Sequence, residues 1–297
     1  MMTYMLFVFA LAVATLLYVL SPFVFPHHAF VGVRLGAANS TSIRVWARAP
    51  DVPRFVVRAR AHGTRYWVES PSTALLAAAD HTGVAVLAGL AAATRYEYSV
   101  EFERAATSGA PPPAPLGGHF STLPLEHQKA DVRIAFGSCT MKSQSAGYEL
   151  TGLSRLLDLS PRPALWLMLG DLIYADVPLS GVGLGADVSL YRAHYRRTLA
   201  DTHAVALERA VPGFYMLDDH EIRNDWKSHT GATFGAAAKV WREYAGALNP
   251  QQERRGGGVG HWYTFAVAHV CVFVADTRTQ RSADTILGAE QLAEAVA

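Results

Sequence analysis

The chain has 297 residues, of which 51% are apolar and 17% charged, and its formal net charge is +1 at pH 7. High apolar content with almost no net charge excludes an intrinsically disordered chain. The absence of excess positive charge argues against a nucleic-acid-binding protein, so we expect no sequence-specific nucleic-acid binding. Two cysteines, Cys139 and Cys271, exclude a disulfide-rich secreted scaffold. The length corresponds to about two domains.

Residues 1–26 are predicted to form a transmembrane anchor. No Asp, Glu, Lys or Arg precedes Arg34. As a helix, the 24 residues Met2–Phe25 would span about 36 Å, which covers the roughly 30 Å hydrocarbon core of a bilayer. A cleaved signal peptide is the alternative, although a basic start and a short apolar region are both missing. We therefore expect a single-pass membrane protein that contacts the membrane through this helix, or alternatively a secreted one.

Residues 30–123 are predicted to form a β-sandwich like those of immunoglobulin or fibronectin type III domains. Apolar and polar residues alternate in Ser42–Arg48, Arg54–Arg60 and Tyr96–Phe102, which is typical of half-buried antiparallel strands. The approach to Tyr96 resembles a tyrosine corner, in which the Tyr hydroxyl bonds to upstream backbone. A carbohydrate-binding face would need several aromatic residues exposed together. We instead expect these aromatic side chains to pack in the core: Trp46, Tyr66, Trp67, Tyr96 and Tyr98.

The sequence turns polar at Pro124–Ala130, where we place a boundary, and residues 131–297 follow a different pattern. Helical spacing occurs at 148–159 and 233–248. Strands are predicted at Val132–Phe136, Ala164–Leu169, Gly213–Leu217, Tyr263–Val267 and Val270–Ala275. Cys271, in the middle of the last strand, is expected in the core. Alternating strands and helices indicate an α/β domain with an open sheet.

Polar residues follow three of these strands, and the carboxyl ends of strands in an open α/β sheet are where ligands bind. A Cys139 thiolate and a Tyr174 phenolate suit a trivalent or thiophilic metal such as iron. Asp171 is placed to bridge two cations, and Asp219 suits a harder divalent ion. Two metals about 3.5–4 Å apart can bind a phosphate and activate a water molecule. His220 could protonate the leaving alkoxide or contact the phosphate.

Three short motifs, Gly137–Cys139, Gly170–Tyr174 and Asp218–Glu221, occur in this order at the strand ends. Together they resemble the alkaline phosphatase D (PhoD-like) family of metallophosphatases. The resemblance runs from about Phe30 to the end of the chain, because that family carries a β-sandwich before its catalytic domain. It implies a metal-dependent phosphoesterase that hydrolyses phosphomonoesters, phosphodiesters or both through a binuclear metal centre. The substrate would be a phosphorylated small molecule, lipid or polymer.

The family pattern also implies roles for individual residues. Cys139 and Tyr174 would bind iron, and Asp171 would bridge to a second metal, commonly calcium or another divalent ion. Asp219 would bind that second metal, and His220 would lie near the scissile phosphate. A later Asp-x-Arg pattern, within Ala275–Arg281, would place Arg278 near the phosphate as well. Asp218, Glu221 and Asn224 are expected to support these residues rather than to bind metal.

The family completes its site with Asp- and His-containing motifs on later strands, whereas this chain ends at Ala297 within a predicted helix. We therefore expect the α/β domain to be incomplete at its C-terminus. A truncated, inactive relative that acts as a membrane-anchored binding protein through its β-sandwich is the alternative function. A second enzymatic alternative makes Cys139 a nucleophile with His220 as its base. Cysteine phosphatases hold phosphate with an Arg six residues after the Cys, and that position is Ser145 here.

Overall fold

The structure of the chain is a computed structural model. It describes Phe9, Val13 and residues 27–103, 111–140, 149–176, 184–227, 229–251 and 260–296. Nearly all of the predicted anchor, residues 1–26, and also Ser145 lie outside the described residues. Within the described ranges, no helix combines the length and the hydrophobicity that crossing a bilayer requires.

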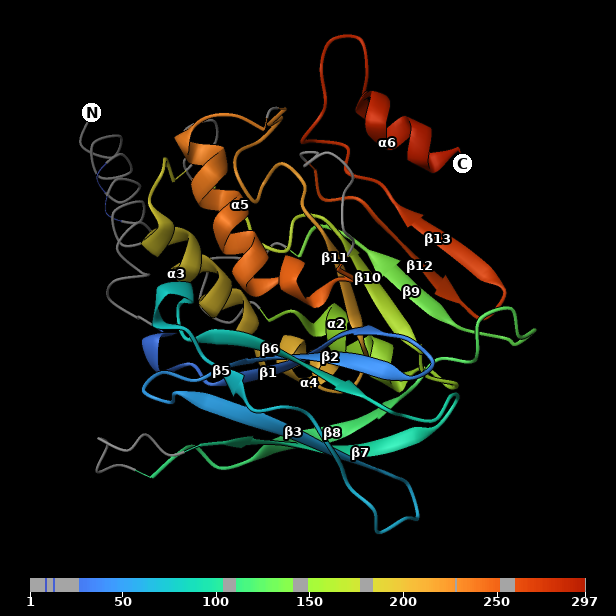
Figure 1. Ribbon diagram of the computed structural model, residues 1–297. Coiled ribbons are helices and arrows are strands. Elements are labelled where there is room, and N and C mark those ends of the chain that lie inside the picture. Colours follow the sequence, from blue (N-terminus) through green and yellow to red (C-terminus); the bar gives the residue numbers. More distant parts are fainter. Residues whose placement is uncertain are drawn as a thin grey trace.

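The first part of the chain folds as two antiparallel sheets in a sandwich-like arrangement, drawn in blue to green in Figure 1. One sheet has the order β1 (Gly32–Ala38), β2 (Ser42–Arg48), β6 (Thr82–Ala88). The other runs β4 (Val68–Glu69), β3 (Arg54–Ala61), β7 (Arg95–Phe102), β8 (Leu116–Ser121), and β5 (Thr73–Ala74) also pairs with β3. Two 3-10 turns, η1 (His27–Ala29) and η2 (Ala77–Ala79), flank these strands. Alternate residues of β7 are buried, which confirms the predicted period-2 pattern.

The tyrosine corner is present. The hydroxyl of Tyr96 accepts a hydrogen bond from the backbone N–H of Ala91 at 2.7 Å. Trp46, Tyr96 and Tyr98 are buried, as expected for core aromatics. This bond fixes the turn into β7, and so it also fixes the position of the strand's first residue, Arg95.

The prediction of core packing is wrong for Tyr66 and Trp67. Tyr66 is 87% exposed and Trp67 is 41% exposed. Both lie in the connection between β3 and β4 rather than on a strand. The Trp67 ring packs instead against the guanidinium of Arg60, 4.9 Å from the ring centroid. Such a contact is typical of an exposed cation–π pair.

The second part of the chain contains a three-stranded parallel sheet with the order β11 (Gly213–Met216), β10 (Leu165–Leu169), β9 (Ile134–Gly137). A separate antiparallel pair, β12 (Tyr263–Val267) and β13 (Val270–Val274), follows late in the chain. The helices are α2 (Thr151–Arg155), α3 (Val188–Leu199), α4 (Thr202–Glu208), α5 (Ala232–Tyr244) and α6 (Gly288–Ala295), with 3-10 turns η3 (Leu156–Asp158) and η4 (Gly246–Leu248). The predicted α/β architecture with a parallel sheet is confirmed.

Two details differ from the prediction. The helix expected over 148–159 is a single α-turn followed by a 3-10 turn. The spacing of three between Leu150, Leu153 and Leu156 suits a 3-10 turn, in which residues i and i+3 share a face. Cys271 is exposed rather than in the core, because β13 is the outer strand of a two-stranded ribbon (Figure 1).

A buried ion pair joins the sandwich to the α/β region. Arg34 in β1 donates from Nε and Nη2 to the carboxylate of Glu208 in α4, at 2.7 and 2.8 Å. Both side chains are at most 2% exposed, and the hydroxyl of Tyr215 donates to the same carboxylate at 3.2 Å. The Arg34 guanidinium also lies 4.7 Å from the centroid of the Tyr215 ring. A charge buried in this way is tolerable only while its partner remains.

A second polar cluster strengthens the same interface. The Asp80 carboxylate, between η2 and β6, accepts bonds from Arg48 in β2 at 3.2 Å and from Arg196 in α3 at 2.5 Å. The hydroxyl of Tyr244 in α5 donates to it as well. Trp46 donates its indole N–H to the backbone oxygen of Glu243 at 2.8 Å. The two parts of the chain therefore share buried polar contacts as well as apolar packing.

We expect Arg34→Met to lower the free energy of unfolding by about 3–5 kcal/mol, because it leaves the Glu208 carboxylate buried without a positive charge beside it. Arg58→Met is the matched control, since its ion pairs with Glu69 and Glu101 are about half exposed. The control should cost less than about 1 kcal/mol. Urea denaturation of both variants measures the difference, and equal losses would contradict a dominant role for the buried pair.

The stability of the chain should fall in acid partly because of His194 in α3. Burial, with the positive charge of Arg197, lowers the pKa of His194 from 6.5 to about 4. As the pH falls from 6.5 to 4, His194 therefore binds a proton in the unfolded state but stays neutral in the folded state. This group alone should remove about 3 kcal/mol over that range. His194→Gln should flatten that part of the pH dependence of unfolding, whereas exposed His62→Gln should leave it unchanged.

Candidate metal centre

The ends of β9 and β10 are connected by backbone hydrogen bonds just beyond the parallel sheet. The N–H of Cys139 donates to the oxygen of Gly170 at 3.2 Å, and the N–H of Thr140 donates to the oxygen of Asp171 at 3.0 Å. The Thr140 hydroxyl adds a bond to the oxygen of Leu172 at 3.1 Å. These bonds continue the register of the strands, so the residues that follow β9 and β10 emerge side by side.

The backbone at these strand ends adopts conformations that non-glycine residues seldom take. Cys139 has φ 65° and Asp171 has φ 58°, in the left-handed region that costs an L-residue roughly 1–2 kcal/mol. Gly170, with φ 110°, precedes Asp171. A Cβ at Gly170 would lie 2.3 Å from the Cβ of Asp218, so only glycine allows the ends of β10 and β11 to approach this closely.

The buried carboxylate of Glu221 holds these two strand ends together. It accepts the backbone N–H groups of Asp171 at 3.1 Å, Leu172 at 2.6 Å and Asp218 at 2.8 Å. Burial, together with the nearby charge of Asp171, raises the pKa of Glu221 to about 8, and the backbone N–H groups oppose that rise. Glu221 therefore supports the site through the backbone, in keeping with its expected supporting role.

Three predicted site residues converge on the carboxylate of Asp171. The thiol of Cys139 donates to its Oδ2 at 3.3 Å, and the hydroxyl of Tyr174 reaches the same oxygen at 3.4 Å. The backbone N–H of His220 donates to Oδ1 at 3.3 Å. The carboxylate thus lies between the ends of all three parallel strands.

Asp219 and His220 place further donor atoms beside Asp171. One donor atom from each of the three residues lies within 4.8 Å of the others. The sequence places His220 near the phosphate, and a ring nitrogen of its imidazole is one of these three atoms. Asp219 is 5% exposed, and its Oδ2 accepts the N–H of Asp225 at 2.5 Å.

Arg278 reaches this acidic group from the segment that follows β13. Its Nη2 lies 3.3 Å from Oδ1 of Asp219, and its Nε donates to Asp218. The buried carboxylate of Asp276 accepts the N–H of Arg278 at 3.0 Å and that of His261 at 2.7 Å. The predicted Asp-x-Arg pattern therefore does bring its arginine to the strand ends.

Asp176 is the residue that the sequence reasoning missed. Its carboxylate lies 2.8 Å from Nδ1 of His220 and accepts the N–H of Asn224 at 2.7 Å. The imidazole also stacks on the Tyr174 ring, 4.3 Å between centroids. Burial lowers the pKa of His220, but the bond and charge of Asp176, with Asp171, outweigh it and raise the pKa. The sequence did contain a sign of this role, because Asp176 directly follows the apolar run Leu172–Ala175.

The electrostatics of the site favour a bound cation. Burial raises the pKa of Asp171, and the charges of Asp218 and Asp219 raise it further. Burial, together with the Cys139 bond and the charge of Asp171, raises the pKa of the Tyr174 phenol as well. The carboxylates are thus close together and poorly hydrated, and a bound cation would offset the repulsion between their charges. Thiol, phenol, carboxylate and imidazole together form a donor set that fits iron beside a harder ion.

We expect Glu221→Gln to destabilise the chain by about 1–3 kcal/mol, because the amide nitrogen would face backbone N–H groups that need an acceptor. Exposed Glu126→Gln is the matched control. Urea denaturation measures the loss, and metal analysis of the same variant should show weaker binding. A variant as stable as the control would contradict the supporting role of Glu221.

Comparisons with known proteins identify the family and the fold of the chain. The family model for PhoD-like phosphatase matches residues 134–296. A solved structure described as "Structure of PhoD" has a TM-score of 0.69 at 20% identity, over 90% of this chain and 58% of that one. This chain therefore spans less than two thirds of the length of that protein. A myokine structure, by contrast, gives a TM-score of 0.24 at 18% identity, over 31% of this chain and 93% of that one.

A search of curated proteins found no match. The family match covers more than half of the chain and includes the ends of all three parallel strands. The chain belongs to the PhoD-like phosphatase family.

Proposed function

We propose that the chain is a metal-dependent phosphoesterase that hydrolyses phosphomonoesters, phosphodiesters or both through a binuclear metal centre. One observation carries the proposal. The Asp171 carboxylate is contacted by Cys139 and Tyr174 on one oxygen and by the His220 backbone on the other. Membership in the PhoD-like phosphatase family supports a phosphate ester as the substrate.

The proposed ligands would form two sets, with Asp171 contributing to both. Cys139 and Tyr174 would hold iron, since thiolate and phenolate donors suit that metal. Asp219 would hold the second ion, calcium or another divalent metal. Two such cations would neutralise the charge of a phosphate and lower the pKa of a bound water.

The protein side chains would position the substrate and move the proton. Asp176 engages Nδ1 of His220, so the other ring nitrogen, Nε2, is the atom that could give a proton to the leaving alkoxide. Arg278, held by Asp218 and Asp219, would bind a non-bridging phosphate oxygen when substrate enters. A guanidinium forms paired hydrogen bonds with a phosphate.

We propose that the substrate is a phosphorylated small molecule, lipid or polymer. We also propose that residues 1–26 form a single-pass membrane anchor, or alternatively that the protein is secreted. An anchor of this kind would favour substrates near a membrane surface.

Two alternatives follow from the same residues. As a nucleophile, Cys139 would need a base, yet its thiol bonds to the Asp171 carboxylate at 3.3 Å while Asp176 engages Nδ1 of His220. That geometry favours a ligand role for the thiol.

An inactive binding protein would use the sandwich, where the exposed aromatics Tyr66 and Trp67 are adjacent.

We expect Asp171→Asn to abolish stoichiometric metal binding and to lower phosphoesterase activity more than about 100-fold, because it removes the shared ligand. Elemental analysis of the purified chain measures iron and the second metal. Hydrolysis of p-nitrophenyl phosphate and of its bis-ester measures activity. Cys139→Ala should lose iron in the same analysis.

Asp158→Asn is the matched control, because Asp158 is exposed and lies in η3, away from the site. It should bind metal and turn over substrate like the unmodified chain. An unmodified chain that binds no metal and hydrolyses neither ester would overturn the proposal and favour the binding-protein alternative. Full activity in Asp171→Asn would overturn it as well.

A further inference from the structure

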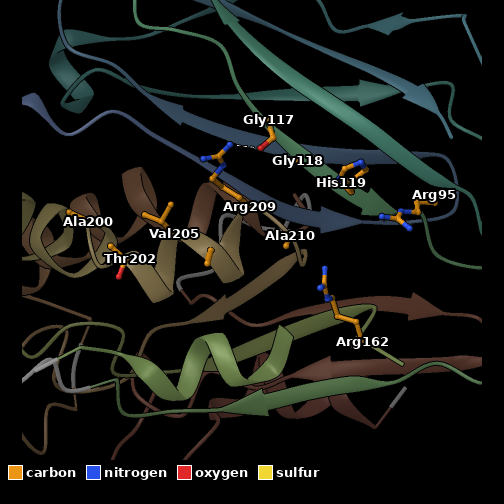
Figure 2. Close-up of a pocket in the computed structure, with 11 residues that line it drawn as sticks. Arg95, Gly117, Gly118, His119, Arg162, Ala200, Thr202, Val205, Arg209 and Ala210 are labelled. Atoms are coloured by element: carbon orange, nitrogen blue, oxygen red, sulfur yellow. Dashed lines mark hydrogen bonds between the residues drawn. The ribbon is translucent and has the colours of Figure 1, made fainter. Parts of the chain in front are cut away.

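A cavity of about 530 Å³ lies between the sandwich and the α/β region. Figure 2 shows β8 and the start of β7 on one side and α4 with the segment before β10 on the other. A neighbouring hollow of about 430 Å³ shares Arg95, His119, Arg162 and Ala210 with it, so the two form one groove. Ligand cavities in proteins commonly measure about 300–1,000 Å³.

The cavity is remote from the candidate metal centre. Arg162 lies before the first residue of β10, whereas Asp171 follows the last residue of that strand. Ala210 likewise precedes β11. A five-residue strand is about 16 Å long. The cavity therefore opens at the amino ends of the parallel strands, and the metal centre lies at their carboxyl ends.

The charged groups that line the cavity are all basic. Arg95, Arg162 and Arg209 lie around it with His119, and Figure 2 shows Arg162 extending toward the strands that carry Arg95 and His119. No Asp or Glu is among the described residues that line it. None of the three arginines forms an ion pair with a carboxylate in the described part of the chain. Glu97, which pairs with His119 across β7 and β8, forms an ion pair with Arg60 at 2.7 Å.

One wall of the cavity is rigid. The Arg209 guanidinium donates to the backbone oxygen of Gly117, and the Tyr98 hydroxyl donates to the backbone oxygen of Arg209 at 2.9 Å. A Cβ on Gly118 would lie 2.9 Å from that same oxygen, and a Cβ on Gly117 would lie 2.2 Å from the oxygen of Tyr98. Gly118 thus lets β8 pass directly against the end of α4, and Gly117 lets it lie close to β7. A fixed wall lowers the entropic cost of binding.

Apart from Thr202 and the two glycines, the rest of the lining is apolar. Ala200, Val205, Ala206 and Ala210, from α4 and the turns on either side of it, line this part of the cavity. An anion alone would use only the arginines and leave this surface in contact with water. The combination suits a ligand that has an anionic head and a small apolar body.

We propose that this cavity binds an organic phosphate, with the phosphate held by Arg95 and Arg162 and the apolar body against α4. Guanidinium groups pair with phosphate through two parallel hydrogen bonds. Among the described residues, the Arg162 side chain donates to the backbone oxygen of Leu157 at 3.4 Å, which leaves other donors of its guanidinium for a ligand. The site is independent of the phosphoesterase proposal, since it shares no residue with the metal centre.

Isothermal titration of the full chain with phenylphosphonate tests this site, because the C–P bond of that probe resists phosphoesterases. Arg95→Gln/Arg162→Gln should raise the Kd about tenfold or more. The double variant Arg65→Gln/Arg155→Gln removes the same charge at exposed positions outside the cavity and should leave the Kd unchanged. Asp171→Asn should also bind normally, which separates this site from the metal centre.

Inorganic phosphate and benzyl alcohol distinguish the two halves of the ligand. Each should bind at least about tenfold more weakly than phenylphosphonate, because each lacks one half. Equal Kd values for the cavity double variant and its control would overturn the proposal. So would no binding of phenylphosphonate below about 10 mM, or inorganic phosphate that binds as tightly as the phosphonate.

Discussion

The Glu221 carboxylate is the constraint on which the candidate centre depends. It accepts backbone N–H groups from the segments that follow β10 and β11, and it is 1% exposed. A buried carboxylate is costly unless its hydrogen-bonding capacity is filled. Here three backbone N–H groups donate to the carboxylate. Moving the two strand ends apart would break these bonds and leave the buried carboxylate without donors. The backbone of Asp171 is strained, with φ 58°. The hydrogen bond from its N–H to Glu221 and the close packing of Gly170 against Asp218 hold it in this conformation.

The positions of the proposed metal ligands follow from that separation. Asp171 and Asp219 approach each other because the ends of their strands are fixed, although their charges repel. Arg278 compensates part of this repulsion from a segment far along the chain. Hydrogen bonds and ion pairs between protein groups thus hold the site in its geometry.

The sequence was most informative where local chemistry and topology coincide. Parallel strands deliver their carboxyl ends to one edge, so Cys139, Asp171 and His220 could be placed together from strand prediction alone. Asp176 was missed because its role depends on the fold of the segment that carries it, which brings it to Nδ1 of His220. Tyr66 and Trp67 were misplaced because composition alone does not separate a strand from the connection after it. The arginines of the cavity come from three segments, and no spacing links them.

The buried pair of Arg34 and Glu208 has a consequence for biosynthesis. The two residues are 174 positions apart, so at 5–20 residues per second a ribosome needs roughly 9–35 s to add the second after the first. Throughout that interval the nascent sandwich exposes a guanidinium that its completed structure buries. The strands can pair with one another, but the face that carries Arg34 must stay hydrated until α4 has emerged. Packing of the sandwich against the α/β region is therefore a late event in synthesis, because it requires Glu208.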